Sequence, residues 1–511
     1  MLRRFVFYLA LVILGSLQPA PRLRAFIINS TDPDPWLTTA SGTRSGNGDP
    51  ATITWSIVPD GTRVSTGVGT RTTASNLIST LDSAFGGNPS QTDLTQQPWF
   101  SLIAGAFGRW SQLGSVDYVY ESHDDGVLHP SSDGQLGVRG DIRLAGFNID
   151  GSGGTLAFTY IPTAGSDMAV DTADMTFFKD NSKGLNYINF RDTLMHEIGH
   201  SFGLEHVSST TDSLLMEPVI DTSSTQPNGP QLDEVRGVQF FFGDPNERSN
   251  GGLGNGTAAR ATSLGPIAEG STRLVGASAD VPKQAISGTA TDFVSISNAS
   301  DIDYYSFNVS QPSLLSATLT PRGGVFTQGS ADDNQTPTTF DANSRSNLAL
   351  SLFNTNGTSI LATADANQAG GIESLANLLL PSAGTYYARI SGADDTIQMY
   401  ELALSPTPIL PGDYNHDGIV DAADYIVWRR LLGQSVTTGS GADGNFDGHV
   451  THADFSVWQT NFGEVASAGA GSGFIAGATV PEPLCLFLAV FGCVFLIAAR
   501  RRRKCPSPAL C

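Results

Sequence analysis

The chain contains 511 residues with a mass of 53.7 kDa, which is too large for one hydrophobic core and predicts about two to four domains. Its 28 basic residues against 49 acidic ones give a formal net charge of −21. Nucleic acid binding draws most of its affinity from Lys and Arg, so this charge makes nucleic acid a poor candidate partner. Hydrophobic residues make up 40% and charged residues 15%, a mixture typical of folded modules. All four cysteines lie at or beyond Cys485, which leaves the rest of the chain without a disulfide.

A basic pair and an apolar run begin the chain. Arg3 and Arg4 precede Phe5–Leu17, and small residues follow at Ala20 and Ala25. This order predicts a secretory signal peptide over residues 1–25. We therefore expect an exported protein of the cell envelope or the extracellular space.

A second apolar run, Leu484–Ala499, is followed by five consecutive cations, Arg500–Lys504. An apolar segment followed by cations is typical of a transmembrane helix whose basic end stays inside the cell. Together with Val480–Pro483, it resembles the PEP-CTERM sorting signal of exported bacterial proteins. The resemblance implies a membrane anchor over residues 480–504 whose cleavage stays open, and a plain single-span anchor is the alternative.

Three stretches rich in small or turn-forming residues divide the chain between these ends: Asn250–Gly256, Pro406–Pro411 and Ala466–Ala478. Such stretches are typical of linkers. They predict a domain over residues 26–246 with a candidate pro-segment at 26–48, a domain over 252–406, a small module over 411–463 and a linker over 464–479.

The first domain alternates strand-like and helical patterns. Thr52–Val58 and Asp141–Phe147 predict strands. Apolar residues recur at helical spacing in Trp99–Trp110, and Phe190–Gly203 predicts a second helix. We expect an α+β domain whose second helix carries the chemistry.

Three of the eight histidines fall close together, at His196, His200 and His206. On a helix, His196 and His200 project from one face one turn apart, and Gly203 can end that helix so that His206 returns as a third ligand. Three imidazoles with one open position are the arrangement of a catalytic zinc rather than a structural one. Glu197 can reach a water on that ion and act as a general base toward it.

The pattern continues at Leu214–Pro218, which matches the methionine turn beneath the metal of metzincin peptidases. With the histidine motif, these residues resemble a matrixin-type metzincin over roughly Asp49–Gly243. The resemblance implies a twisted mixed sheet with an active-site helix, zinc endopeptidase activity, and supporting roles for Gly203, Met216 and Pro218.

The same resemblance makes two further statements about this domain. Asp141–Leu144 is similar to the edge strand along which family members bind an extended substrate. Phe158 and Ala169 stand where animal matrixins carry histidines for a structural zinc. We therefore expect one catalytic zinc and no structural one.

Residues 150–157 resemble the calcium loop of the same family, which implies one or more Ca²⁺ ions in this domain. Oxygen donors of this kind suit Ca²⁺, and a glycine-rich turn with solvated carboxylates is the alternative. The implied ligands are the carboxylates of Asp150, Asp171 and Asp174 and the carbonyls of Gly151 and Gly153.

The second domain contains short alternating runs separated by turns, which predict an antiparallel β-sandwich. Asp301–Phe307 and Gly384–Ile390 resemble the pre-peptidase C-terminal domain found beside secreted bacterial peptidases. Two roles stay open, a module that handles substrate or binds a surface, and a spacer whose aromatic residues form its core. The expected strands are Asp303–Val309, Leu314–Leu319, Leu348–Phe353, Thr385–Ile390 and Met399–Leu404.

The third module is an internal repeat, in which residues 413–424 align without a gap with residues 443–454. Side-chain oxygens at positions 1, 3, 5, 9 and 12, a carbonyl at position 7 and a glycine at position 6 are typical of calcium loops. Each loop closes with Asp, and the pair resembles the duplicated calcium loops of type I dockerins; a solvated acidic turn is the alternative. The predicted ligands are Asp413, Asn415, Asp417, Ile419, Asp421 and Asp424 in loop 1, and Asp443, Asn445, Asp447, His449, Thr451 and Asp454 in loop 2.

The partner of this dockerin-like module stays open. Dockerins usually carry Ser or Thr at loop positions 10 and 11, where cohesins bind, but this chain has Ala422-Ala423 and His452-Ala453. A cohesin-like partner and a calcium-stiffened spacer are both compatible with the sequence. Thr451 at position 9 predicts weaker calcium binding in loop 2 than in loop 1.

Two functions follow from these features. The first is an exported, membrane-tethered zinc endopeptidase that hydrolyses proteins or peptides of the envelope or the extracellular space. The alternative is a surface binding or docking protein whose peptidase domain is inactive. The intact set of His196, His200, His206 and Glu197 favours the first, because a decayed site loses its ligands or its base first.

Overall fold

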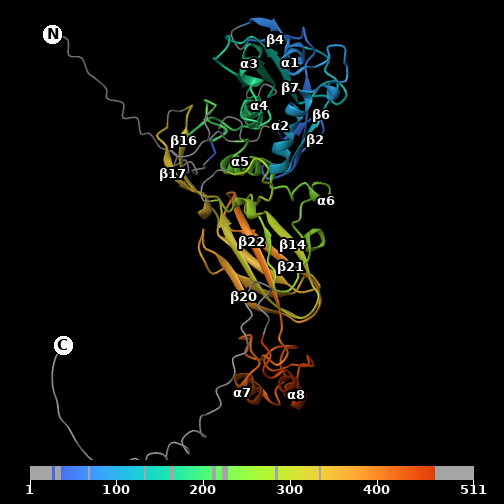
Figure 1. Cartoon of the computed structure of the whole chain (residues 1–511), viewed down its shortest axis with the longest axis vertical. Coiled ribbons are helices and arrows are strands. Elements are labelled where there is room, and N and C mark those ends of the chain that lie inside the picture. The colour runs from blue at the N-terminus through green and yellow to red at the C-terminus, as the bar shows by residue number, and fades with distance from the viewer. Residues whose placement is uncertain are drawn as a thin grey trace, which may run out of the picture. The chain divides into compact units, whose positions relative to one another are not determined.

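The computed structural model describes residues 26–28, 36–66, 70–131, 134–160, 166–209, 214–220, 222, 228–281, 286–332 and 335–465 (Figure 1). The predicted signal peptide over residues 1–25, the PEP-CTERM-like anchor over 480–504 and all but the first two residues of the linker over 464–479 lie outside these ranges. Within the described ranges, no helix is long and apolar enough to cross a membrane.

A five-stranded mixed sheet forms the base of the first domain. Its strand order is β6-β3-β7-β9-β8, and β8 is an edge strand that pairs antiparallel with β9, whereas the other pairs are parallel. The strands are β3 (Ala51–Ile57), β6 (Val116–Tyr120), β7 (Ile142–Phe147), β8 (Ala157–Thr159) and β9 (Met168–Asp171). Two small antiparallel pairs are separate from this sheet: β1 (Thr38–Thr39) with β2 (Gly42–Thr43), and β4 (Arg63–Ser65) with β5 (Thr72–Ala74).

Helices pack around one hydrophobic core in this domain. The predicted helices are confirmed as α2 and α4, and the indole of Trp110 on α2 donates to the carbonyl of Met195 on α4 at 3.0 Å. Trp55 of β3 stacks on Phe107 of α2 with ring centroids 4.6 Å apart, which joins sheet and helix. The helices are α1 (Leu77–Phe85), α2 (Phe100–Leu113), α3 (Met175–Phe178), α4 (Ile188–Ser201) and α5 (Leu232–Phe242), with a short α6 (Ser249–Gly252) after them.

The assignment of Asp141–Leu144 to a substrate-binding edge strand is wrong. β7, which contains Ile142–Leu144, lies inside the sheet between β3 and β9 and is buried along its whole length. A strand covered on both faces and paired on both sides has no edge to offer to a peptide. The edge nearest the active-site helix is β8, whose Thr159 contacts Glu197 of α4.

The candidate pro-segment over residues 26–48 contributes to the core of this domain. Phe26 and Trp36 are buried, and Phe26 packs on Phe240 of α5 with ring centroids 5.4 Å apart. The Trp36 indole donates to the carbonyl of Ser201 at the end of α4. The described residues of this segment, 26–28 and 36–48, therefore form part of the first domain.

The second domain is a β-sandwich with a core of its own, as its alternating pattern predicts. The five expected strands are confirmed as β14, β15, β18, β21 and β22, but β11 pairs parallel with β14, so the sandwich is not wholly antiparallel. One sheet contains β11 (Thr262–Pro266), β14 (Ile302–Val309), β21 (Gly384–Gly392), β18 (Leu348–Phe353) and β19 (Ile360–Ala364). The other contains β12 (Arg273–Val275), β13 (Val294–Ile296), β22 (Gln398–Pro408), β15 (Ser313–Arg322) and β20 (Glu373–Leu380).

A hairpin of the second domain pairs with a strand of the first, a contact that no local sequence pattern predicts. The hairpin consists of β16 (Val325–Ser330) and β17 (Thr338–Asp341), and β16 pairs antiparallel with β10 (Val207–Ser209). β10 begins one residue after His206. The sandwich domain therefore contacts the chain segment that carries the third predicted zinc ligand.

The third module is a pair of loop–helix units with internal two-fold correspondence. α7 (Ala422–Leu431) follows loop 1 and α8 (His452–Asn461) follows loop 2. The indole of Trp428 on α7 donates to the carbonyl of Thr451, and that of Trp458 on α8 donates to the carbonyl of Asp421, at 2.7 and 2.8 Å. Each helix therefore binds position 9 of the other repeat, as the gapless alignment of the two repeats would lead one to expect.

Candidate metal centre

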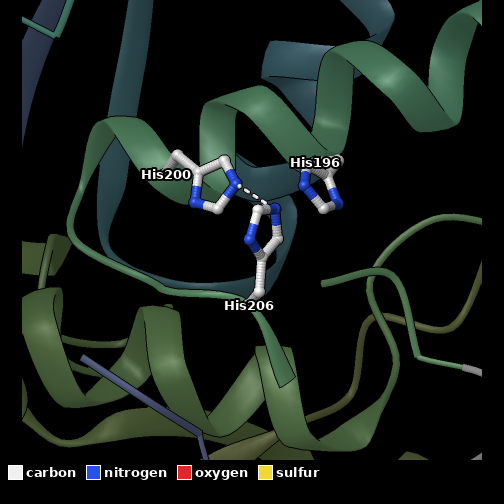
Figure 2. Close-up of side chains that lie close together, drawn as sticks. All are labelled: His196, His200 and His206. Atoms are coloured by element: carbon white, nitrogen blue, oxygen red, sulfur yellow. Dashed lines mark hydrogen bonds between the residues drawn. The ribbon is translucent and has the colours of Figure 1, made fainter. Parts of the chain in front are cut away.

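Helix α4 presents two imidazoles on one face, and the chain then turns back to present a third (Figure 2). The helix ends at Ser201, and Gly203 has a φ of 104°, a value that residues with a Cβ rarely adopt. The amide of Leu204 donates to the carbonyl of Gly199 at 3.1 Å, which closes the turn. This turn brings His206 beneath His196 and His200.

The three imidazoles converge through their Nε2 atoms. Ring centroids of His200 lie 4.6 Å from those of both His196 and His206, and His196 lies 5.2 Å from His206. The Nε2 atoms of His200 and His206 are 3.2 Å apart. Each ring offers one nitrogen within 4.8 Å of the other two.

Each Nδ1 atom has an oxygen partner that can only accept a hydrogen bond. His196 Nδ1 lies 2.7 Å from the carbonyl of Leu215, and His200 Nδ1 lies 2.6 Å from that of Leu204. His206 Nδ1 lies 2.9 Å from a carboxylate oxygen of Asp332. These partners place the proton on Nδ1 and leave the Nε2 lone pairs directed at one another.

Three converging lone pairs fit a divalent cation. Ligands about 2.0–2.1 Å from a tetrahedral zinc lie about 3.3 Å apart, close to the separation of the two Nε2 atoms. Burial, together with the neighbouring imidazoles, holds the pKa of His196 well below its usual range and lowers that of His200 to about 4. Neutral imidazoles are the form that binds a metal, so the donor set suits zinc.

Glu197 lies beside these ligands and is almost completely buried. Thr159 of the edge strand β8 donates to its carboxylate, with Oγ1 2.7 Å from Oε2. Burial raises the pKa of Glu197 to about 7, against the lowering effect of the Thr159 hydrogen bond. A cation held by the histidines would lower this pKa again. The carboxyl group is therefore fixed in place, with a proton affinity suited to exchange with water.

The predicted methionine turn lies beneath α4. Met216 is buried, and its sulfur would lie only 2.6 Å from a Cβ added to Gly199, so the helix approaches the turn at its glycine. The carbonyl of Leu215 in the same turn accepts from His196, as described above. Met216 thus supports the helix by packing. Pro218 is exposed, and Val219 after it has 75% of its surface exposed.

Residues at the two positions of the animal structural zinc are apolar and packed. Ala169 is buried in a small cluster with Val58, Val64 and Phe147, and Phe158 packs against it. Such side chains offer no ligand atom, so they do not fit a second zinc ion at these positions.

The predicted calcium ligands of the first domain gather around one loop. Asp171 and Asp174 are buried, and Asp174 Oδ1 accepts from the amide of Gly153 at 2.8 Å while its Oδ2 has no hydrogen-bond partner. Asp150 accepts from the amide of Thr155, and its own amide donates to Asp171. Gly151 has a positive φ within the same turn. The loop is ordered by these carboxylates, and its binding of calcium stays a prediction.

The two dockerin-like loops have matching internal hydrogen bonds. In loop 1, Asp413 accepts from the amide of Gly418, and Asp424 accepts from the amides of Asn415 and Asp421. The second loop repeats this set with Asp443, Gly448, Asp454, Asn445 and Thr451. Amides of Ile419 and His449, at position 7, donate to Asp417 and Asp447. The twelve predicted ligand positions therefore occupy two equivalent turns.

Two further features of the structure have no local signal in the sequence. The first is Asp332, which lies on the hairpin of the second domain and contacts His206. The second is a group of three carboxylates, Asp244, Glu247 and Asp303, whose oxygens lie within 4.8 Å of one another. We call it the junction cluster, because Asp244 and Glu247 follow α5 and Asp303 lies on β14. No local pattern links residues so far apart in the chain.

Comparisons with known proteins agree with this geometry in two regions. Residues 82–243 match the family model described as Matrixin, and residues 411–460 match the model described as Dockerin type I domain. A part of this chain, 28% of its length, resembles the pre-peptidase C-terminal domain of a collagenase from Bacillus anthracis at 15% identity over 96% of that chain, with a TM-score of 0.17. That likeness is too weak to support a conclusion.

Curated relatives match about 30% of this chain. Metalloendoproteinase 2-MMP of Arabidopsis thaliana is 28% identical over 29% of this chain, and stromelysin-1 of Equus caballus is 33% identical over 30%. The matches span only 38% and 30% of these relatives. The two family models, together with the histidine centre and the duplicated loops, identify a matrixin peptidase domain at residues 82–243 and a dockerin type I domain at residues 411–460.

Proposed function

We propose that this protein is an exported zinc-dependent endopeptidase that hydrolyses peptide bonds in proteins of the envelope or the extracellular space. The observation that carries the proposal is the convergence of three imidazole Nε2 atoms beside a buried carboxyl group. The matrixin match over residues 82–243 supports it. Export also agrees with the predicted signal peptide and with the matrixin and dockerin domains.

The residues of the site divide the reaction among them. His196, His200 and His206 would hold one zinc ion and leave one coordination position open. When bound, zinc supplies Lewis acidity toward water and a peptide carbonyl. Glu197, held by Thr159, takes a proton from the attacking water and passes it to the amine nitrogen as the C–N bond breaks.

Replacement of Glu197 by Gln tests this function. A glutamine keeps the size of the side chain but cannot accept the proton, so we expect kcat/KM to fall by about 100-fold or more. Casein or a quenched peptide library supplies the substrate, and a zinc chelator should abolish cleavage by the wild type. Metal analysis should find the same zinc content in both proteins, because Glu197 is not a ligand.

The matched control is Glu121→Gln. Glu121 follows β6 at the opposite edge of the sheet from β8, and it accepts from the amide of Gly137. This variant should cleave like the wild type. A wild type that cleaves none of these substrates, or residual cleavage that depends on neither zinc nor Glu197, would instead favour a docking protein with an inactive peptidase domain.

A second candidate role belongs to the dockerin type I domain. Its two equivalent loops and its family match support calcium-dependent docking, with a cohesin-like domain as the partner class. Titration of the full chain with a type I cohesin domain tests this role. Binding in calcium that is lost in a calcium chelator is the expected result, and absence of binding in calcium would favour the stiffened spacer.

A further inference from the structure

The third predicted zinc ligand lies where two domains meet. His206 immediately precedes β10, and β10 pairs with β16 of the sandwich domain in the register Val207 to Ser330 and Ser209 to Gln328. The amide of Ala331, after β16, donates to the carbonyl of His206 at 3.1 Å. The sandwich domain therefore continues the strand pairing up to the ligand itself.

One side chain of the hairpin then contacts both the backbone and the ring of His206. Asp332 Oδ2 accepts from the amide of His206 at 3.2 Å, and its Oδ1 lies 2.9 Å from His206 Nδ1. The two oxygens thus fix the ligand at two points. His196 and His200 differ in this respect, because their Nδ1 atoms face backbone carbonyls of the first domain.

Buried contacts of the hairpin hold Asp332 in this position. The side-chain amide of Gln328 donates to Asp233 of α5 at 2.9 Å, and both residues are buried. The guanidinium of Arg236, also on α5, lies 5.2 Å from the ring centre of Phe340 on β17. A hairpin attached through strand pairing, a buried hydrogen bond and a cation–π contact cannot easily move away from His206.

We propose that Asp332 is a positioning residue for the zinc ligand His206, so that the metal centre is completed by the sandwich domain. This inference rests on the proposed function, because it assumes that the histidines hold zinc. A carboxylate that accepts a hydrogen bond from Nδ1 fixes the tautomer and the orientation of the ring. It also makes Nε2 a stronger electron-pair donor to the metal. The contact between Asp332 and His206 also gives the second domain a role beyond that of a spacer.

Zinc affinity of the full chain, measured by competition with a chromophoric chelator, tests the proposal without reference to activity. Loss of such a partner typically weakens metal binding by 10- to 100-fold. The side chain of Asp332 is 50% exposed, so we expect the low end, about 10-fold, for Asp332→Ala. Asp332→Asn keeps an acceptor oxygen without the charge and should lie between Ala and wild type.

The matched control is Asp365→Asn, which removes one exposed charge from the same domain. Its zinc affinity should equal that of the wild type. Thermal unfolding of each variant reports whether the hairpin still folds, and the Asn variant keeps the test valid if the Ala variant unfolds.

The outcomes separate this inference from the proposed function. Wild-type zinc affinity in both Asp332 variants overturns the positioning role and leaves the endopeptidase proposal intact. A wild type that binds no zinc overturns both. A wild type that binds zinc but cleaves nothing rejects the endopeptidase alone, since the affinities of the variants still decide the role of Asp332.

Discussion

The histidine centre and the dockerin-like loops are built over very different distances along the chain. Each loop draws its six predicted ligands from twelve consecutive residues, and its carboxylates are held by amides of the same loop. The histidine centre begins with a short motif, but its rings are oriented by Leu215 from the methionine turn and by Asp332 from another domain.

The two regions therefore depend on the rest of the fold to different degrees. A loop that supplies its own hydrogen bonds needs little beyond its own sequence. Ligands oriented from distant segments depend on the packing that brings those segments together. Changes to distant packing should therefore affect the histidine centre, whereas the loops should respond to changes within their own sequence.

The largest effect is expected from Gly199→Ala, which alters the contact between α4 and the methionine turn. An added Cβ would lie 2.6 Å from the sulfur of Met216, which is buried in the core, so this side chain must shift and repack. Overpacking of this kind costs about 1–3 kcal/mol, which exceeds the gain of up to about 1 kcal/mol from replacing a helical glycine. We expect a lower melting temperature of the first domain and weaker zinc binding, measured by calorimetry and chelator competition.

A glycine in open surroundings supplies the control. Gly108 lies in α2, and nothing stands within 4 Å of a Cβ added there. Gly108→Ala should therefore stabilise the domain by about 0.5–1 kcal/mol and leave zinc affinity unchanged. If Gly199→Ala behaved in the same way, the contact with Met216 would not matter to the centre.

The same distinction explains what the sequence could predict. His196, His200 and His206 were grouped correctly because helical spacing and a glycine turn act within eleven residues. Asp332 was not foreseen because 126 residues separate it from His206 and no local pattern marks it. The sequence of Asp141–Leu144 does not show whether this strand lies at an edge or inside the sheet. That position depends on which other strands pair with it, and those strands lie elsewhere in the chain.

The junction cluster gives a second, smaller test of long-range assembly. Burial, followed by repulsion from neighbouring carboxylates, raises the pKa of Glu247 to about 9 and that of Asp303 well above its usual range. Burial also raises the pKa of Asp244 to about 7. A carboxyl group whose folded pKa is raised stabilises the protein at low pH and loses that contribution as pH rises through the folded value. The free energy of unfolding in cation-free buffer should therefore fall as pH rises from about 4, the ordinary carboxyl pKa, to about 9.

Asp303→Asn should reduce this loss. An amide has the shape of the protonated carboxyl group and can keep the hydrogen bond from Tyr400, which lies 2.5 Å from Asp303 Oδ2. One pKa unit corresponds to about 1.4 kcal/mol, so we expect the variant to gain about 1 kcal/mol at pH 9 and almost nothing at pH 4. Calorimetric melting curves at several pH values measure the difference in stability between Asp303→Asn and the wild type, with the exposed Asp365→Asn as control. Parallel curves for Asp303→Asn and wild type would contradict the expectation.

The smallest effect is expected within the loops, where position 9 is Asp421 in loop 1 and Thr451 in loop 2. Both side chains cap the following helix, since Asp421 accepts from the amide of Ala423 at 2.7 Å and Thr451 from that of Ala453 at 3.1 Å. Thr451→Asp therefore keeps the cap and adds a negative charge to the loop.

Calcium affinity rises with the number of charged ligands, so we expect Thr451→Asp to tighten loop 2 by roughly 3- to 10-fold. The reverse change, Asp421→Thr, should weaken loop 1 by a similar factor. Calorimetric calcium titration of the full chain should then show two unequal sites in the wild type and more nearly equal sites in Thr451→Asp. Because this change lies within one loop, zinc affinity at the histidines should not move, and a coupled change at both sites would disprove the independence of the two regions.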